Sequence, residues 1–255
     1  MSILDGVQRV LSLYAEGATD LSFTEVASRL ALPKSTASRL LNQMQAYGLL
    51  DQDAGSRRYR AGALLANAVR AGMAATPLDE ACRIVLARLS DSSGLTAYLS
   101  TLNQRDTVVL QRLNGSHPVQ VLSPPGSRRA ASDTAMGRAL LSRLSDGEFE
   151  ALYGADGAQL LPVEGRDCPA SVGELAERIA RIRDERCATA IDQAMPGIGA
   201  VAAAVRDPAT GELRGLCVSF VSFQADAQRV AQLRDSVLEQ VGALGRDLQD
   251  PFWLA

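Results

Sequence analysis

The sequence predicts an α+β protein in two parts, a small helical N-terminal part that ends in a short hairpin and a larger part that mixes strands with helices. Apolar residues recur at helical spacing early in the chain and then give way to a polar, basic stretch. Further along, strand-like runs alternate with amphipathic stripes. The predicted boundaries are residues 1–62 for the first part, 63–76 for a linker helix and 77–255 for the second part.

The composition is that of an ordinary globular protein. Of the 255 residues, 47% are hydrophobic and 22% are charged, which disfavours wholesale disorder. The formal net charge of −3 argues against a protein that coats nucleic acid nonspecifically, although it is compatible with a local basic face. No apolar run reaches the length of a membrane span, and the N-terminus lacks the pattern of a signal peptide. We therefore expect a cytoplasmic protein with no membrane partner.

Side chains that bind metals or form catalytic triads are scarce. Cys82, Cys168, Cys187 and Cys217 are scattered without a CxxC pair, and His117 is the single histidine. This spacing offers no zinc site, so we expect reduced thiols in the core. No GxSxG motif occurs, which argues against a serine triad. We therefore predict no cofactor and no enzymatic activity.

Three helices are predicted before residue 50. The first carries an apolar stripe along residues 3–14. Ser22 and Glu25 are spaced as in a capping box, in which both side chains satisfy backbone donors at a helix start. Pro33 suits the first turn of the third helix, because its missing N–H costs nothing there, and Gly48 marks the end of that helix.

The third helix has one apolar face and one polar face. Short hydroxyls near a helix N-terminus allow close approach to a duplex, and an arginine can form two hydrogen bonds with guanine. This pattern is typical of a recognition helix in the major groove, and an ordinary solvated face is the alternative. The residues predicted to contact DNA from this helix are Lys34, Ser35, Thr36, Ser38, Arg39 and Asn42.

A polar hairpin follows directly. The segment from Lys34 to Arg60 holds five cations and two acids, an excess of three positive charges. Wing arginines bind phosphates and position a domain without reading sequence. The predicted wing contacts are Arg57, Arg58 and Arg60. Together with the helices before it, this hairpin predicts a winged helix-turn-helix.

The second part is predicted to hold an antiparallel sheet with flanking helices. Runs bounded by Gly, Pro, Asn or Asp predict strands at residues 96–102, 107–113, 119–123, 200–206 and 213–223. Apolar stripes predict helices around residues 78–89, 136–144, 175–182 and 230–248, with capping residues at Ser132, Asp133 and Ser171.

Specific motifs resemble those of the IclR family of bacterial transcription regulators. Residues 32–41 (LPKSTASRLL), 48–50 (GLL) and 59–62 (YRAG) resemble its winged-helix domain, and residues 126–144, 175–197 and 200–219 resemble its GAF-like effector-binding domain. The resemblance implies a homodimer or homotetramer that binds double-stranded operator DNA. It also implies that a small organic acid or aromatic metabolite controls DNA affinity, with repression of catabolic genes as the commoner outcome.

The resemblance further implies a ligand pocket lined by Ala135, Met136, Ala190, Ile198, Ala200, Cys217 and Ser219. The chain departs from the family pattern at Asp133, where a small neutral residue is common, and at Gln193, where Glu is common. An acid at a helix start would occupy donors that an acidic effector needs. We therefore expect a ligand less acidic or more apolar than a short keto acid, although Arg128 and Arg129 offer partners for a carboxylate. Simple repacking of a core is the alternative.

Two other functions stay open for the second part. It would serve only oligomerisation or partner binding if the stripe at residues 230–248 packs on another subunit. An enzyme has little support, because the GxGxxA match at residues 197–202 does not follow a strand and open a helix as a dinucleotide site does.

Overall fold

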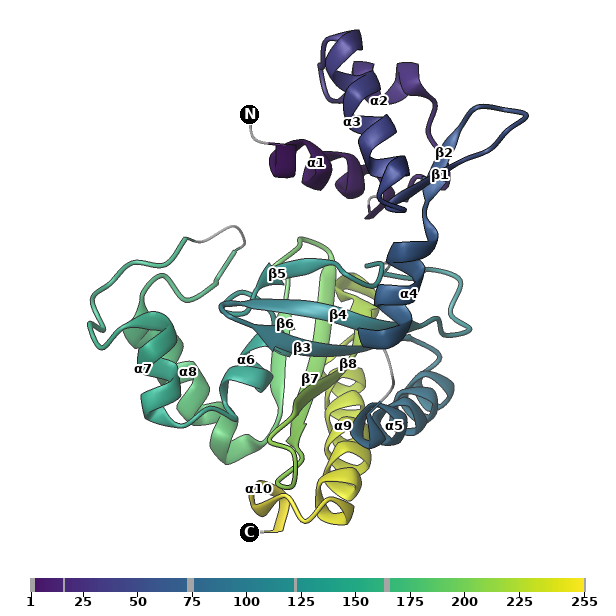
Figure 1. Cartoon of the computed structure of the whole chain (residues 1–255). Helices are drawn as coiled ribbons and strands as arrows, with labels where there is room; N and C mark the ends of the chain where they lie inside the picture. The colour runs from purple at the N-terminus through teal and green to yellow at the C-terminus, as the bar shows by residue number, and fades with distance from the viewer. Residues whose placement is uncertain (1–2, 16, 73–75, 122, 163–165, 255) are drawn as a thin grey trace. The chain divides into compact units, whose positions relative to one another are not determined.

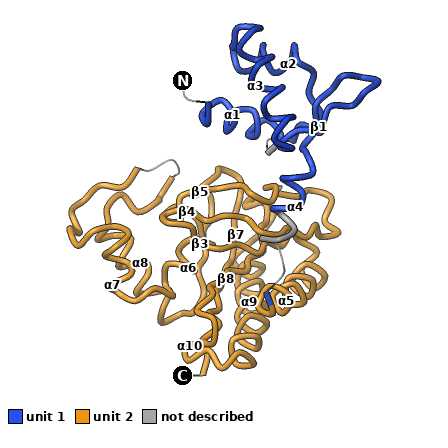
Figure 2. Tube along the Cα trace, viewed as in Figure 1, with its two compact units in different colours: residues 1–76 blue, residues 77–255 orange. Residues whose placement is uncertain are grey.

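The computed structural model describes residues 3–15, 17–72, 76–121, 123–162 and 166–254. The chain splits into two compact units, Met1–Thr76 and Pro77–Ala255, each of which is described by itself (Figure 2). The predicted linker helix corresponds to α4 (Ala63–Gly72) in the first unit, and residues 73–75 of that prediction lie outside the described residues. Among the helices of the described residues, none has the length and apolar character needed to cross a membrane.

The first unit is a winged helix-turn-helix, as predicted (Figure 1). Its elements are α1 (Ile3–Ala15), α2 (Phe23–Arg29), α3 (Lys34–Ala46), β1 (Leu50–Gln52) and β2 (Tyr59–Ala61), followed by α4. The two strands pair antiparallel, with Asp51 opposite Arg60. The apolar stripe of α3 faces inward, where Leu40, Leu41 and Met44 pack against α1 and the hairpin.

Local sequence signals explain where these helices begin and end. Ser22 Oγ accepts from the Glu25 N–H at 3.2 Å, and the Ser22 N–H donates to Glu25 Oε2 at 2.7 Å, so the capping box is confirmed. Pro33 is the N-cap residue of α3. Gly48 has a φ of +70°, the left-handed conformation that lets the chain leave α3 and enter the hairpin.

The second unit is built on a six-stranded antiparallel sheet with strand order β5-β4-β3-β8-β7-β6 (Figure 1). Its strands are β3 (Thr96–Asn103), β4 (Asp106–Leu113), β5 (Arg128–Ala130), β6 (Ala188–Ile191), β7 (Ile198–Arg206) and β8 (Leu213–Val221). The four longer strands confirm the predictions for their segments, and the sheet with its flanking helices confirms the α+β class.

One predicted strand is wrong. The described residues within 119–123 form a loop, because the Tyr98 hydroxyl binds their backbone where a neighbouring strand would have bound it. The sequence analysis missed β5 and β6 instead. Both are short edge strands without a long apolar alternation, so neither carries a strong signal.

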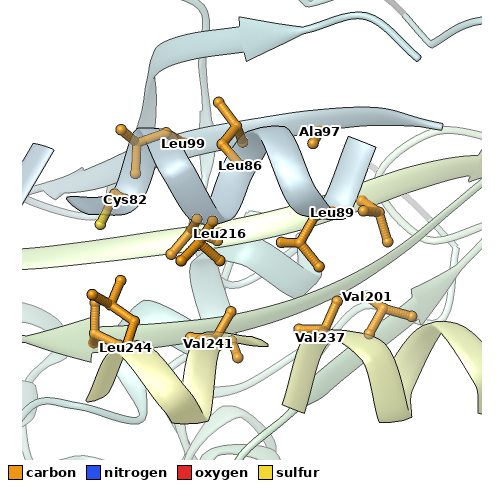
Figure 3. Close-up of a cluster of buried hydrophobic side chains, with 14 of the residues drawn as sticks. Cys82, Leu86, Leu89, Ala97, Leu99, Val201, Leu216, Val237, Val241 and Leu244 are labelled. Carbon is orange, nitrogen blue, oxygen red and sulfur yellow. The ribbon is translucent and has the colours of Figure 1, made fainter. Parts of the chain in front are cut away.

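One face of the sheet is closed by α5 (Pro77–Ser93) and α9 (Ala227–Asp247). Leu86, Leu216 and Val241 lie in the apolar cluster between these helices and the strands (Figure 3). The final short helix α10 (Pro251–Leu254) adds Trp253, whose Nε1–H donates to the Ala204 carbonyl at 3.1 Å. The stripe at residues 230–248 is therefore buried within its own unit.

The other face carries α6 (Ala135–Leu141), with α7 (Asp146–Tyr153) and α8 (Val172–Glu185) beyond it. The predicted cap of α6 is corrected, since Thr134 is the N-cap residue and its Oγ1 accepts from the Gly137 N–H at 2.9 Å. The helix ends at Leu141, short of the predicted residue 144. Ser171 caps α8 as predicted. The helix α7 was not predicted, although Ser145 and Glu148 form its capping box.

We expect Leu216→Ala to lower the free energy of unfolding by about 2–5 kcal/mol, because Leu216 is fully buried at the centre of the cluster. Urea denaturation followed by the fluorescence of Trp253, the single tryptophan, measures this change. The control is Ile84→Ala on α5, where the side chain is 48% exposed and the loss should stay below about 0.5 kcal/mol. Equal losses for the two variants would contradict this packing.

Candidate DNA-contacting surface and ligand pocket

The outer face of α3 is exposed and polar. Ser35, Ser38, Arg39 and Asn42 line an open depression along it. Lys34 is exposed at the start of the helix, whereas Thr36 is half-buried and less accessible than the sequence analysis assumed. Five of the six helix positions predicted to contact DNA are therefore on the surface, aligned along one face.

The hairpin adds further positive charge. Arg57 and Arg60 are exposed, and like Lys34 and Arg39 they form no ion pair within the part of the chain that the structure describes. The turn between the strands is held by Asp53, whose Oδ1 accepts from the Ser56 N–H at 2.7 Å. Hydrogen bonds from Ser56 hold the pKa of the Asp53 carboxyl below its usual value. The outer face of α3 and the hairpin thus carry four exposed cations that form no ion pair with a described residue.

Arg58 behaves differently from its neighbours. Its Nε donates to Asp20 Oδ1 at 2.8 Å, and its Nη2 lies 2.9 Å from Glu25 Oε2. The hydrogen bond to Asp20 raises the pKa of Arg58, so the guanidinium stays charged. Arg58 therefore ties the hairpin to the capping box at the start of α2.

The second unit contains a cavity of about 120 Å³ between the sheet and the first turn of α6. The sheet contributes one face to it, from Thr107 and Val109 on β4 across to Ala190 on β6. All seven residues predicted from the family resemblance line this cavity, namely Ala135, Met136, Ala190, Ile198, Ala200, Cys217 and Ser219.

A loop closes one side of the cavity. Tyr98 on β3 donates its hydroxyl hydrogen to the Val121 carbonyl and accepts from the Ser123 N–H at 3.1 Å. Val121, Ser123 and Ser127 then line the cavity together with Tyr98 itself. Burial raises the pKa of Tyr98, so the phenol stays protonated and keeps its donor. The Tyr98 side chain thus holds the loop to the sheet at Val121 and Ser123, while Gly126 and Ser127 exchange backbone hydrogen bonds with Val109 on β4.

The four cysteines are buried, as predicted, and none of them forms a disulfide within the described chain. Burial raises the pKa of the Cys217 thiol to about 12 and that of Cys187 to about 11. Cys217 therefore lines the cavity as a neutral thiol and not as a nucleophile. No cluster of metal-ligating side chains occurs among the described residues.

Comparison with known families identifies both units. The family model for the IclR helix-turn-helix domain matches residues 7–54, and the model for the bacterial transcriptional regulator IclR C-terminal domain matches residues 71–249. The chain belongs to the IclR family of bacterial transcriptional regulators.

Full-length relatives share the same organisation. The chain is 28% identical over 255 residues to the HTH-type transcriptional regulator XynR of Escherichia coli. The alignment covers 98% of this chain and 100% of XynR. The Thermotoga maritima IclR structure superposes with a TM-score of 0.76 at 17% identity, covering 96% of this chain and 98% of that one. The structure of an IclR homolog complexed with 4-hydroxybenzoate from Microbacterium hydrocarbonoxydans superposes with a TM-score of 0.74 at 20% identity. The match covers 97% of this chain and 99% of that one.

The IclR resemblance gave a partial set of pocket residues, and strand register supplies others. Ser100 and Val109 are paired across β3 and β4, and both line the cavity with Tyr98 and Thr107. Alternation along the two predicted strands would have placed these four residues on one face, but it could not show which face α6 covers. Arg129 also lines the cavity, whereas Arg128 pairs with Asp106 and does not.

We expect Tyr98→Phe to loosen the loop without unfolding the unit, because it removes one donor and one acceptor from the loop backbone. A hydrogen bond contributes about 0.5–1.5 kcal/mol, so exchange of the Ser123 amide hydrogen should accelerate roughly 2–10-fold. Site-resolved hydrogen exchange measures this rate. Tyr47→Phe is the control, since Tyr47 is 74% exposed on the first unit, and an unchanged Ser123 rate in Tyr98→Phe would refute the anchoring role.

Proposed function

We propose that this IclR-family protein represses a catabolic operon by binding operator DNA through α3 and the β1–β2 hairpin, and that a small-molecule effector in the α6 cavity controls that binding. The observation that carries this proposal is the exposed face of α3, on which hydroxyl, amide and guanidinium groups stand beside free cations. A cavity in the same chain supplies a place for the effector.

The DNA contacts divide into two kinds. Ser35, Ser38, Arg39 and Asn42 are proposed to reach base edges, where Arg forms two hydrogen bonds with guanine and Asn two with adenine. Lys34, Arg57 and Arg60 are proposed to bind phosphates and fix the register. Arg58 contacts DNA only if it leaves Asp20 and Glu25, so we assign it to positioning the wing.

The proposed regulation of DNA affinity depends on the symmetry of a homo-oligomer. Two winged helices of a homodimer or homotetramer read half-sites whose spacing is set by the DNA helical repeat. An effector that binds one arrangement of the winged helices better than another shifts the population toward that arrangement. DNA affinity then changes because only one arrangement matches the half-site spacing. The effector class we propose is an organic acid or an aromatic metabolite, a proposal supported by the 4-hydroxybenzoate bound to the Microbacterium homolog.

A purely oligomeric role for the second unit has less support. The apolar stripe of α9 was the feature that favoured it, and Leu233, Val237 and Val241 are buried against the sheet of the same unit. A purely oligomeric role also does not account for the cavity, which is lined by small and apolar side chains.

Arg39→Ala tests the recognition helix. Selection of duplexes from a randomised library gives the preferred sequence, and fluorescence anisotropy then compares it with single-base variants. We expect a loss of about 1–3 kcal/mol on the preferred duplex and relaxed preference at one base position, because a fork to one base is lost. If discrimination at every position survives the substitution, the assignment of this face is wrong.

Arg57→Ala tests the wing. It should weaken binding to all duplexes to a similar extent and reduce the slope of log affinity against log salt by about 1, since one phosphate contact is lost. The same anisotropy titration over a range of salt concentrations measures the slope. A substitution that changes base preference and leaves the slope unchanged would contradict a phosphate role.

A further inference from the structure

The cavity has one charged lining residue among the described residues, and it is a cation. Arg129 lies on the edge strand β5, opposite Thr107, which also lines the cavity. Its guanidinium forms no ion pair with any described residue. Its neighbour Arg128 is held by Asp106, with Nη2 and Oδ2 3.1 Å apart. The two adjacent arginines therefore differ in charge balance: Arg128 is paired with a carboxylate, whereas Arg129 has no ion-pair partner among the described residues and lines the cavity.

A second positive charge lies behind the opposite wall. Arg138 on α6 is 2% exposed, and its guanidinium donates to the Ser132 carbonyl at 2.8 Å, to the Thr189 carbonyl at 3.5 Å and to Gln193 Oε1. These acceptors are neutral, and no carboxylate lies within ion-pair distance of Arg138 among the described residues. Buried cations are ordinarily paired with a carboxylate, and Arg138 is held by neutral acceptors instead.

The charge on Arg138 persists at neutral pH. Burial is the main cause that lowers its pKa, to about 10, and the like charge of Arg178 acts in the same direction. Asp133 and Asp167 partly oppose this shift. Asp133 is buried and accepts from the Ser132 hydroxyl, whereas Asp167 is bound by Arg178. Neither acid lines the cavity.

Gln193 connects the buried Arg138 to the cavity surface. It lines the cavity, and its Oε1 is already occupied by Arg138. Its remaining polar atom is the Nε2 amide, which donates one hydrogen to Asp167 Oδ2 at 3.3 Å and has a second hydrogen to donate. The wall therefore offers a hydrogen-bond donor to a bound molecule, and no lining residue within the described chain is Asp or Glu.

We infer that Arg129 is the residue that makes this cavity prefer a small carboxylic acid, of the effector class proposed above, over the neutral amide of the same shape. The inference rests on the proposed effector function of the same cavity. Met136, Met195 and Ile198 supply the apolar contacts, and Arg129 supplies a charge-assisted hydrogen bond to a carboxylate. The cavity of about 120 Å³ is close to the roughly 150 Å³ of engineered cavities that hold a benzene ring.

The sequence analysis left both Arg128 and Arg129 open as partners for a carboxylate, and the structure favours Arg129. The Asp133 carboxylate was expected on the donors at the start of α6, but Thr134 caps the helix and the Asp133 carboxylate accepts from Ser132. Gln193 stands where Glu is common in the family. Beside the buried Arg138 this replacement favours an anionic ligand, because a glutamate there would neutralise the cation and repel the ligand.

The test uses acid and amide pairs of the same shape on the full-length protein. The probes are benzoate with benzamide, 4-hydroxybenzoate with 4-hydroxybenzamide, and pyruvate with pyruvamide. Thermal shift and isothermal titration calorimetry measure binding to the wild type, Arg129→Gln, Arg128→Gln and Gln193→Glu. Arg128→Gln is the matched control, since it removes the same charge from the adjacent position outside the cavity.

We expect at least one acid to bind about tenfold or more tightly than its amide to the wild type and to Arg128→Gln. Arg129→Gln should remove that preference, and Gln193→Glu should weaken the acid while leaving the amide nearly unchanged. Amides that bind as tightly as acids, a preference that survives in Arg129→Gln, or equal effects at the two arginines would each overturn the inference. Binding of amides alone would overturn it while keeping the cavity as an effector site. If no probe binds, the anion site fails, and specific DNA binding by the same preparation shows separately whether the regulator assignment stands.

Discussion

The buried guanidinium of Arg138 is the interaction on which the ligand cavity depends. It joins two segments that are far apart in the sequence, namely the turn at Ser132 before α6 and the segment that runs from Thr189 on the edge strand β6 to Gln193. Each accepting oxygen would be costly to leave unpaired in the interior, so the two segments are held together as a unit. The cavity wall is therefore built around a positive charge, and its chemistry follows from that constraint.

The two faces of the sheet divide the structural and the binding roles. On one face α5 and α9 form a continuous apolar cluster with the strands, and their buried side chains serve to pack the core. On the other face the short helix α6 covers only part of the sheet, and Gly215 permits the approach, since a Cβ there would lie 2.4 Å from Met136 Sδ. The first turn of α6, the loop held by Tyr98 and the Gln193 loop then enclose the remaining space. Incomplete coverage by a short helix thus creates the site.

The features that could be predicted from the sequence are those that depend on residue type and on neighbours close along the chain. The capping box at Ser22, the helix end at Gly48 and the longer strands follow from residue type and periodicity, and the family resemblance placed seven residues on the cavity. Features that depend on pairing at a distance were missed. The loop at residues 119–123 has a β-like composition and is held by the side chain of Tyr98, and Arg58 has the position of a phosphate contact but pairs with Asp20. The difference between Arg128 and Arg129 likewise depends on register and not on residue type.

We propose that the affinity of this IclR-family protein for specific DNA responds to a small molecule. A gel-shift assay on the DNA upstream of its own gene, with excess nonspecific competitor and a panel of metabolites, tests it most directly. We expect a specific shift that at least one small acid strengthens or weakens, while its neutral amide has no effect. The absence of any specific shift, even at low salt where phosphate contacts are strongest, would contradict it.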